Sequence, residues 1–92
     1  MVQAARRYAQ EGSAALGERM FDAALHALKP MERMPQIGSP RLGQLCEIPR
    51  LRSWRVDGFP VLWFYFEADD HIDVIRLLDD RQDIVAILTS KD

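Results

Sequence analysis

The sequence is short of cysteine and of long hydrophobic runs. Cys46 is the only cysteine, so the chain has no internal disulfide and no thiolate zinc cluster. The longest apolar run, Val61 to Phe66, is far too short to cross a bilayer, and nothing resembles a signal peptide. We therefore expect a cytoplasmic protein with no membrane contact, no metal and no other cofactor.

A basic excess is also missing. Twelve Lys and Arg stand against fourteen Asp and Glu, which gives a net charge of −2. Proteins that bind nucleic acids usually carry surplus positive charge to neutralise phosphates, so direct nucleic-acid binding is not expected. The middle of the chain is locally basic, with one acid, Glu47, among Arg41, Arg50, Arg52 and Arg55. A local site for an anionic group stays open.

The length is that of a single domain, residues 1–92. At 92 residues and 48% hydrophobic residues, a core can form, although the chain is near the lower limit for folding without disulfides or metals. A partner chain or self-association would suit a domain of this size.

The N-terminal third has helical patterning. Residues 2–11 are rich in helix formers, and Gly12-Ser13 interrupts them. From Ala14, apolar residues recur every three or four positions, which predicts an amphipathic helix and, with the first, a helical hairpin. Pro30 predicts a kink followed by one further turn. Pro35, Gly38 and Pro40 predict an extended loop through Gly43.

The second half has strand patterning. Strands are predicted at residues 50–56, 59–66 and 72–78, with Asp57-Gly58 as a tight turn whose two central residues both need positive φ. The middle strand is apolar on both faces and should be central. In the third, Ile72, Val74 and Arg76 should face one way.

Asp79 and Asp80 are predicted to cap a final helix over residues 81–88. The expected fold is α+β: an N-terminal helical hairpin packed on a three-stranded antiparallel sheet, with a short C-terminal helix.

Several motifs in the last two-thirds of the chain occur together in one known family. They are the Pro-x-x-Gly loop at 35–38, Gly43 before Leu51-Arg52, Asp57-Gly58-Phe59-Pro60, the aromatic strand ending at Tyr65, and the run 72–78 leading to residues 81–84. In order and spacing they resemble the RelE/ParE toxin superfamily, and ParE-type toxins in particular.

The resemblance has two departures. Family members usually begin with a β-strand before the helical hairpin, whereas this chain starts inside the first helix. Without that strand, a sheet edge would be left for a second copy or an antitoxin to cover. Family members often have a histidine after the last strand, where this chain has Asp79, and an arginine where it has Gln82.

The resemblance implies a toxin of a type II toxin–antitoxin system, associated with stress responses and silenced by a cognate antitoxin. ParE-type members inhibit DNA gyrase, and RelE-type members cleave messenger RNA on the ribosome. RelE-type cleavage needs clustered cations and a late acid–base residue. Here the lysines are Lys29 and Lys91, and neither a tyrosine nor a histidine follows His71. We therefore expect a binding inhibitor without catalytic residues.

Five residues are predicted to bind partners: Arg52, Trp54, Tyr65, Arg76 and Arg81. Arginines suit acidic segments because their donors form a fixed fork, although solvated pairs within the sheet would look the same in sequence. The aromatic residues fit a core as well as a partner groove. Two alternatives to the gyrase-type inhibitor remain: a RelE-type ribonuclease, and a degenerate member that binds antitoxin without being toxic. Homodimers and hetero-oligomers with the antitoxin both stay open.

Overall fold

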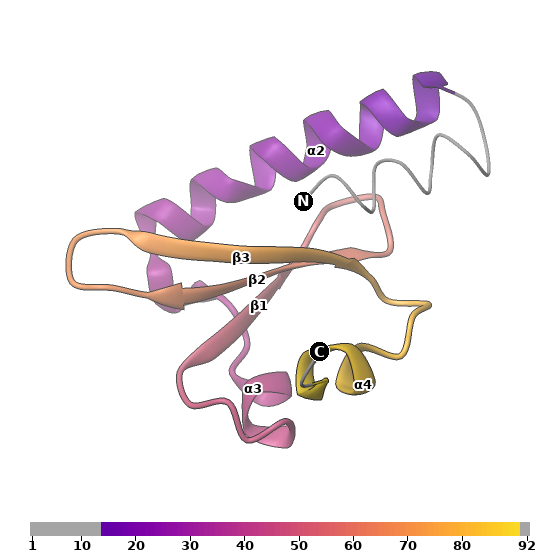
Figure 1. Ribbon diagram of the computed structural model, residues 1–92. Helices are drawn as coiled ribbons and strands as arrows, with labels where there is room; N and C mark the ends of the chain where they lie inside the picture. The colour runs from indigo at the N-terminus through magenta and orange to yellow at the C-terminus, as the bar shows by residue number, and fades with distance from the viewer. Residues whose placement is uncertain (1–13, 91–92) are drawn as a thin grey trace.

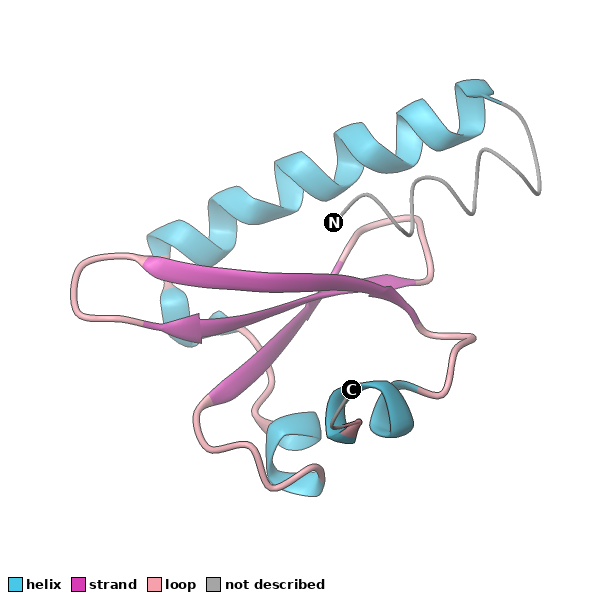
Figure 2. Cartoon of the chain, in the orientation of Figure 1, coloured by secondary structure: helices cyan, strands magenta, loops and turns pink. Residues whose placement is uncertain are grey.

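The computed structural model describes residues 14–90 and shows an α+β fold (Figures 1 and 2). The elements, in chain order, are α2 (Ala14–Arg33), η1 (Pro35–Ile37), α3 (Arg41–Leu45), β1 (Leu51–Arg55), β2 (Val61–Glu67), β3 (Ile72–Asp79) and α4 (Ile84–Thr89). The fold class and the C-terminal helix are confirmed. The predicted helix over residues 2–11 lies outside the described residues, so the helical hairpin stays a prediction.

The three strands form one antiparallel sheet in the order β1-β2-β3. The central position of β2 is confirmed, and the strand bounds lie within two residues of those expected. The helix α2 lies against one face of the sheet, and α3 and α4 lie against the other (Figure 1). The apolar character of β2 on both faces follows from this double cover.

Each face of the sheet has its own core. On the α2 face the buried residues are Met20, Ala24, Met31, Val56, Val61, Trp63, Tyr65 and Leu77. On the opposite face Leu51, Phe64 and Leu78 are buried, with apolar residues of α3 and α4 packed against them. The Trp63 indole Nε1 donates to the Ala24 carbonyl at 2.8 Å. This bond satisfies a buried donor and ties α2 to the central strand.

A β-bulge changes which side chains of β3 share a face. Val74 pairs with Tyr65, but Arg76 pairs with Phe64, so Ile75 is the extra residue. Val74 therefore shares the α2 face with Tyr65, and Arg76 lies on the opposite face with Phe64. The prediction that Ile72, Val74 and Arg76 face the same way is wrong, because an alternating pattern carries no sign of an inserted residue.

The turn between β1 and β2 also differs from the prediction. Gly58 has φ 81°, and the non-glycine residues with positive φ in the described chain are Glu47 and Arg50. The Phe59 amide donates to the Val56 carbonyl at 3.3 Å, so the turn spans residues 56–59 and needs positive φ only at its second central residue. The expectation of positive φ at both central residues is therefore wrong.

Three local predictions in the connecting segments have mixed outcomes. Pro30 lies inside α2, which continues through Arg33, so the further turn is confirmed. The segment expected to be an extended loop contains η1 and α3 instead. The last helix begins at Ile84, where the Asp83 carboxylate accepts from the Ala86 amide. The predicted caps at Asp79 and Asp80 are wrong, because Asp79 ends β3 as a fully buried residue.

Candidate functional site

Arg52 lies on the α2 face of β1 and is held by the preceding loop. It pairs across the sheet with Tyr65. Its guanidinium Nη1 donates to the Gly38 carbonyl at 2.7 Å and to the Gln36 carbonyl at 3.2 Å. These hydrogen bonds from a charged donor fix the side chain. The Nη1 group of Arg52 thus anchors the loop and is not free to bind a partner.

Tyr65 is fully buried and its hydroxyl is used within the chain. The Oη accepts from the Gly38 amide at 2.9 Å and donates to the Pro35 carbonyl at 2.8 Å. Burial raises the pKa of the Tyr65 hydroxyl, while the Gly38 hydrogen bond and the charge of Arg52 act in the opposite direction. The hydroxyl therefore stays protonated at neutral pH and serves as a structural donor, and the ring has no exposed surface for a partner.

Trp54 forms the floor of a groove between α2 and β1. It is half-buried on the α2 face of the sheet, and the cavity beside it measures about 340 Å³. The facing helix presents alanines one turn apart, and these small side chains leave the indole uncovered. The lining residues are Ala23, His26, Ala27, Pro30, Trp54, Arg55 and Asp57. The groove thus has an apolar floor and a rim with both charge signs.

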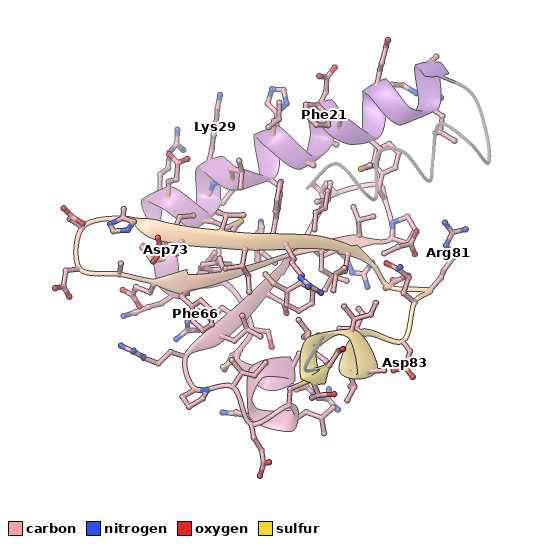
Figure 3. All side chains as sticks on the ribbon, viewed as in Figure 1. Phe21, Lys29, Phe66, Asp73, Arg81 and Asp83 are labelled. Carbon is pink, nitrogen blue, oxygen red and sulfur yellow. The ribbon has the colours of Figure 1, made fainter. Side chains whose placement is uncertain are left out.

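Arg76 and Arg81 lie away from this groove. Arg76 is exposed on the sheet face opposite α2. Arg81 lies in the turn before α4 (Figure 3), where its Nη2 contacts the buried Asp79 carboxylate at 2.7 Å. A buried carboxylate needs a paired cation, so Arg81 stabilises the end of β3. Because the bulge sends Arg76 to the face opposite Arg52, these two predicted partner-binding arginines do not share one surface.

A second, polar pocket lies at the other end of β1. It also measures about 340 Å³ and is lined by Arg50, Arg52, Glu67, Ala68 and Asp69. Arg50 has φ 67°, a left-handed conformation that is costly for a residue with a side chain. The two cations face two carboxylates, so the pocket offers no net attraction to phosphate.

The described residues offer few groups suited to acid–base or nucleophilic chemistry. Cys46 is buried. His71 is exposed in the β2–β3 turn, where its ring contacts the carboxylates of Asp70 at 2.6 Å and Asp73 at 3.0 Å. Hydrogen bonds to these carboxylates, Asp70 first, raise the pKa of His71. Between residues 14 and 90, no three His, Cys, Asp or Glu side chains gather where they could hold a metal ion.

No helix within residues 14–90 combines the length and apolar character that a membrane crossing requires.

Sequence reasoning missed several residues of the groove. The sequence pattern placed Ala23 and Ala27 in the apolar stripe of α2 and Asp57 in a turn. It did not indicate that all three line the groove. Two alanines four residues apart opposite an aromatic strand residue are a usable signal, because such a pair leaves space beside a larger side chain. Nothing in the sequence shows which strand they face.

Comparison of the chain with protein-family models and with characterised proteins finds no match.

Proposed function

We propose that the protein is a ParE-like toxin of a type II toxin–antitoxin system, which inhibits its target by docking and is neutralised by a cognate antitoxin. The observation that carries the proposal is the groove beside Trp54. Its half-buried aromatic floor and charged rim are suited to an apolar anchor residue of another polypeptide. The order of the motifs from Pro35 to Ile84 is the basis for proposing the ParE-like family. DNA gyrase is the proposed target by analogy with that family alone.

The distribution of cations supports docking over RNA cleavage. A ribonuclease of the RelE type must surround one phosphate with several positive groups. Here Arg52 is bound to the loop, Arg81 to Asp79, and Arg76 is on the other face of the sheet. The residues that would have to converge are therefore dispersed. This arrangement favours inhibition by binding.

The direct test is a gyrase supercoiling assay with the purified chain, run beside a ribosome-dependent messenger RNA cleavage assay. We expect loss of supercoiling and intact messenger RNA. Cleavage with normal supercoiling would show the ribonuclease alternative to be correct. If neither assay responds and expression without antitoxin leaves bacterial growth unchanged, the non-toxic antitoxin-binding alternative replaces the proposal.

Variants of the groove test whether it is the docking surface. Trp54→Ala removes the anchor site, and Asp57→Arg changes only an exposed rim charge. Loss of a central aromatic contact typically costs about 2 kcal/mol or more, so the inhibitory concentration should rise about 30-fold for Trp54→Ala. Lys29→Ala, on the outward side of α2 (Figure 3), is the control. Equal inhibition by the Trp54 variant and the control would remove the groove from the mechanism.

A further inference from the structure

Among the residues that the structure describes, none pairs with the outer edge of β3. The strand is eight residues long and lies at the end of the sheet order, and within residues 14–90 only β2 pairs with it. Val74 is 39% exposed and Ile75 is 46% exposed, which is high for apolar residues in a sheet. An uncovered, partly apolar edge is a template for another strand.

The ladder alternation shows which backbone groups this edge offers. The Ala68 amide donates to the His71 carbonyl at 2.9 Å, which makes these two residues a hydrogen-bonded pair at the turn. Hydrogen-bonded and non-hydrogen-bonded pairs alternate along an antiparallel ladder. With the observed register and the bulge, the amides and carbonyls of Ile72, Val74 and Leu77 therefore point away from β2.

The flank of α2 adds apolar surface above this edge. Ala23 and Ala27 line the groove toward β1, so the opposite flank of the helix overhangs β3. That flank carries Phe21, which is half-buried (Figure 3), and Leu25, which is 41% exposed. Phe21, Leu25 and Val74 thus each keep apolar surface exposed on this side of the molecule.

We propose that this edge binds a second copy of the chain, with the two β3 strands antiparallel about a twofold axis at Val74. The two sheets then join into one continuous sheet. In this register Val74 faces Val74 of the second copy and Ile72 faces Leu77, all residues whose backbone groups point outward. The bulge allows this register to pair charged side chains across the interface, because it brings Asp73 and Arg76 to the same face of the sheet.

Charge complementarity identifies a second copy as the occupant. With the axis at Val74, Asp73 of each copy lies opposite Arg76 of the other, so the dimer contains two cross-strand ion pairs. Both side chains belong to exposed residues on the face opposite α2. They form a non-hydrogen-bonded pair, the type in which opposing side chains are closest. Asp73 contacts His71 through Oδ1 only, which leaves its second oxygen for the arginine.

Dimerisation at this edge is independent of the proposed toxin function and is tested by the oligomeric state alone. Sedimentation velocity of the full chain should show a monomer–dimer equilibrium with a dissociation constant on the order of 10 µM, because a single strand pair is a small interface. Asp73→Arg and Arg76→Asp should each weaken dimerisation about tenfold or more, because each variant places like charges opposite each other twice.

An equimolar mixture of the two variants is the decisive sample. In the mixed dimer the arginine introduced at position 73 of one variant faces the aspartate introduced at position 76 of the other. The unmutated Arg76 of the first faces the unmutated Asp73 of the second, so dimerisation should return to the wild-type level. Recovery also shows that both variants are folded. Asp22→Arg and Lys29→Asp, which make the same charge changes at exposed positions of α2, should dimerise normally.

Three results would overturn the proposal. The first is a wild-type chain that stays monomeric well above the expected dissociation constant. The second is a single variant that dimerises as tightly as the wild type, which would place the contact elsewhere. The third is a mixture in which dimers do not return, which would exclude the register.

Discussion

The two edge strands of the sheet, β1 and β3, differ in how far other segments cover their outer backbone. At β1, Ser39 forms an isolated bridge with Ser53, with amide-to-carbonyl distances of 2.8 and 2.9 Å in the two directions. Arg52 and Tyr65 hold the same loop through Gly38. At β3, nothing within residues 14–90 covers the outer backbone, and apolar side chains remain exposed.

This difference shows that, within the described residues, a short chain covers one sheet edge with a loop and leaves the other without one. The segment from Pro35 to Ser39 covers part of the β1 edge. Ordering its backbone costs conformational entropy, and hydrogen bonds from β1 and β2 offset that cost. At Ser53, the backbone groups on the outer side of β1 are therefore already paired and not open to another strand. The contacts proposed with other chains use the groove beside Trp54 and the edge of β3 instead.

The protection of β1 should be lost when Gly38 gains a side chain. A Cβ at Gly38 would lie 2.4 Å from the Tyr65 Oη and 2.9 Å from the Ser53 carbonyl oxygen. The backbone contact cannot be relieved by a rotamer change, so Gly38→Ala should lower the free energy of unfolding by about 3 kcal/mol. Urea denaturation measures this, with Ser39→Ala as the control. Equal stability of the two variants would show that the loop is not packed as described.

A milder change keeps the loop in place but removes its anchor. Tyr65→Phe retains the buried ring and leaves the Gly38 amide without its acceptor, which should cost about 1–2 kcal/mol. Hydrogen exchange should speed up at the Ser39 and Ser53 amides, while the Phe64 amide on the β3 side of β2 is unchanged. Uniformly faster exchange across the sheet would argue that the hydroxyl supports the whole fold rather than one edge.

The open edge should tolerate a polar residue. Ile75 is 46% exposed, so Ile75→Ser should change the free energy of unfolding of the monomer by no more than about 0.5 kcal/mol. Leu77→Ser, two residues along the same strand but 2% exposed, should cost several times more. Similar losses for both, measured by urea denaturation in dilute solution, would show that Ile75 is covered.

The smallest effect concerns the turn that leads into β3. The hydrogen bond with Asp70, followed by that with Asp73, raises the pKa of His71 above its ordinary 6.5, and the same contact lowers the pKa of Asp70 below 3.8. The stabilisation from His71 is complete below pH 6.5 and is lost as pH rises through its higher folded pKa. The part from Asp70 is complete above pH 3.8 and is lost as pH falls through its lower folded pKa.

Proton NMR titration of His71 checks this directly. Asp70→Asn should lower the pKa of His71 toward its ordinary value, whereas Asp69→Asn, beside it in the turn, should leave that pKa in place. A downward shift of equal size in both variants would indicate a general charge effect instead of the Asp70 contact.

Much of the fold follows from local patterns in the chain. The apolar periodicity from Ala14, the two-faced apolar run at Val61 and the turns at Asp57-Gly58 and Asp69-Asp70 are enough to predict a helix and three antiparallel strands, because periodicity and turn chemistry act over a few residues. The two short helical segments η1 and α3 were missed because their form depends on distant parts of the chain. The helix α3 packs against β1, and the carbonyls of Pro35 and Gln36 in η1 accept hydrogen bonds from Tyr65 and Arg52.

The arrangement around the candidate site depends on contacts between distant parts of the chain. Gly38 and Tyr65 are separated by 27 positions, and Trp63 and Ala24 by 39, so their spatial relation has no local signature. The amino-acid sequence by itself determined the kinds of elements and the motifs of the RelE/ParE resemblance. Only the tertiary structure decided that Arg52 and Arg76 lie on opposite faces, because one extra residue in β3 reverses the alternation beyond it.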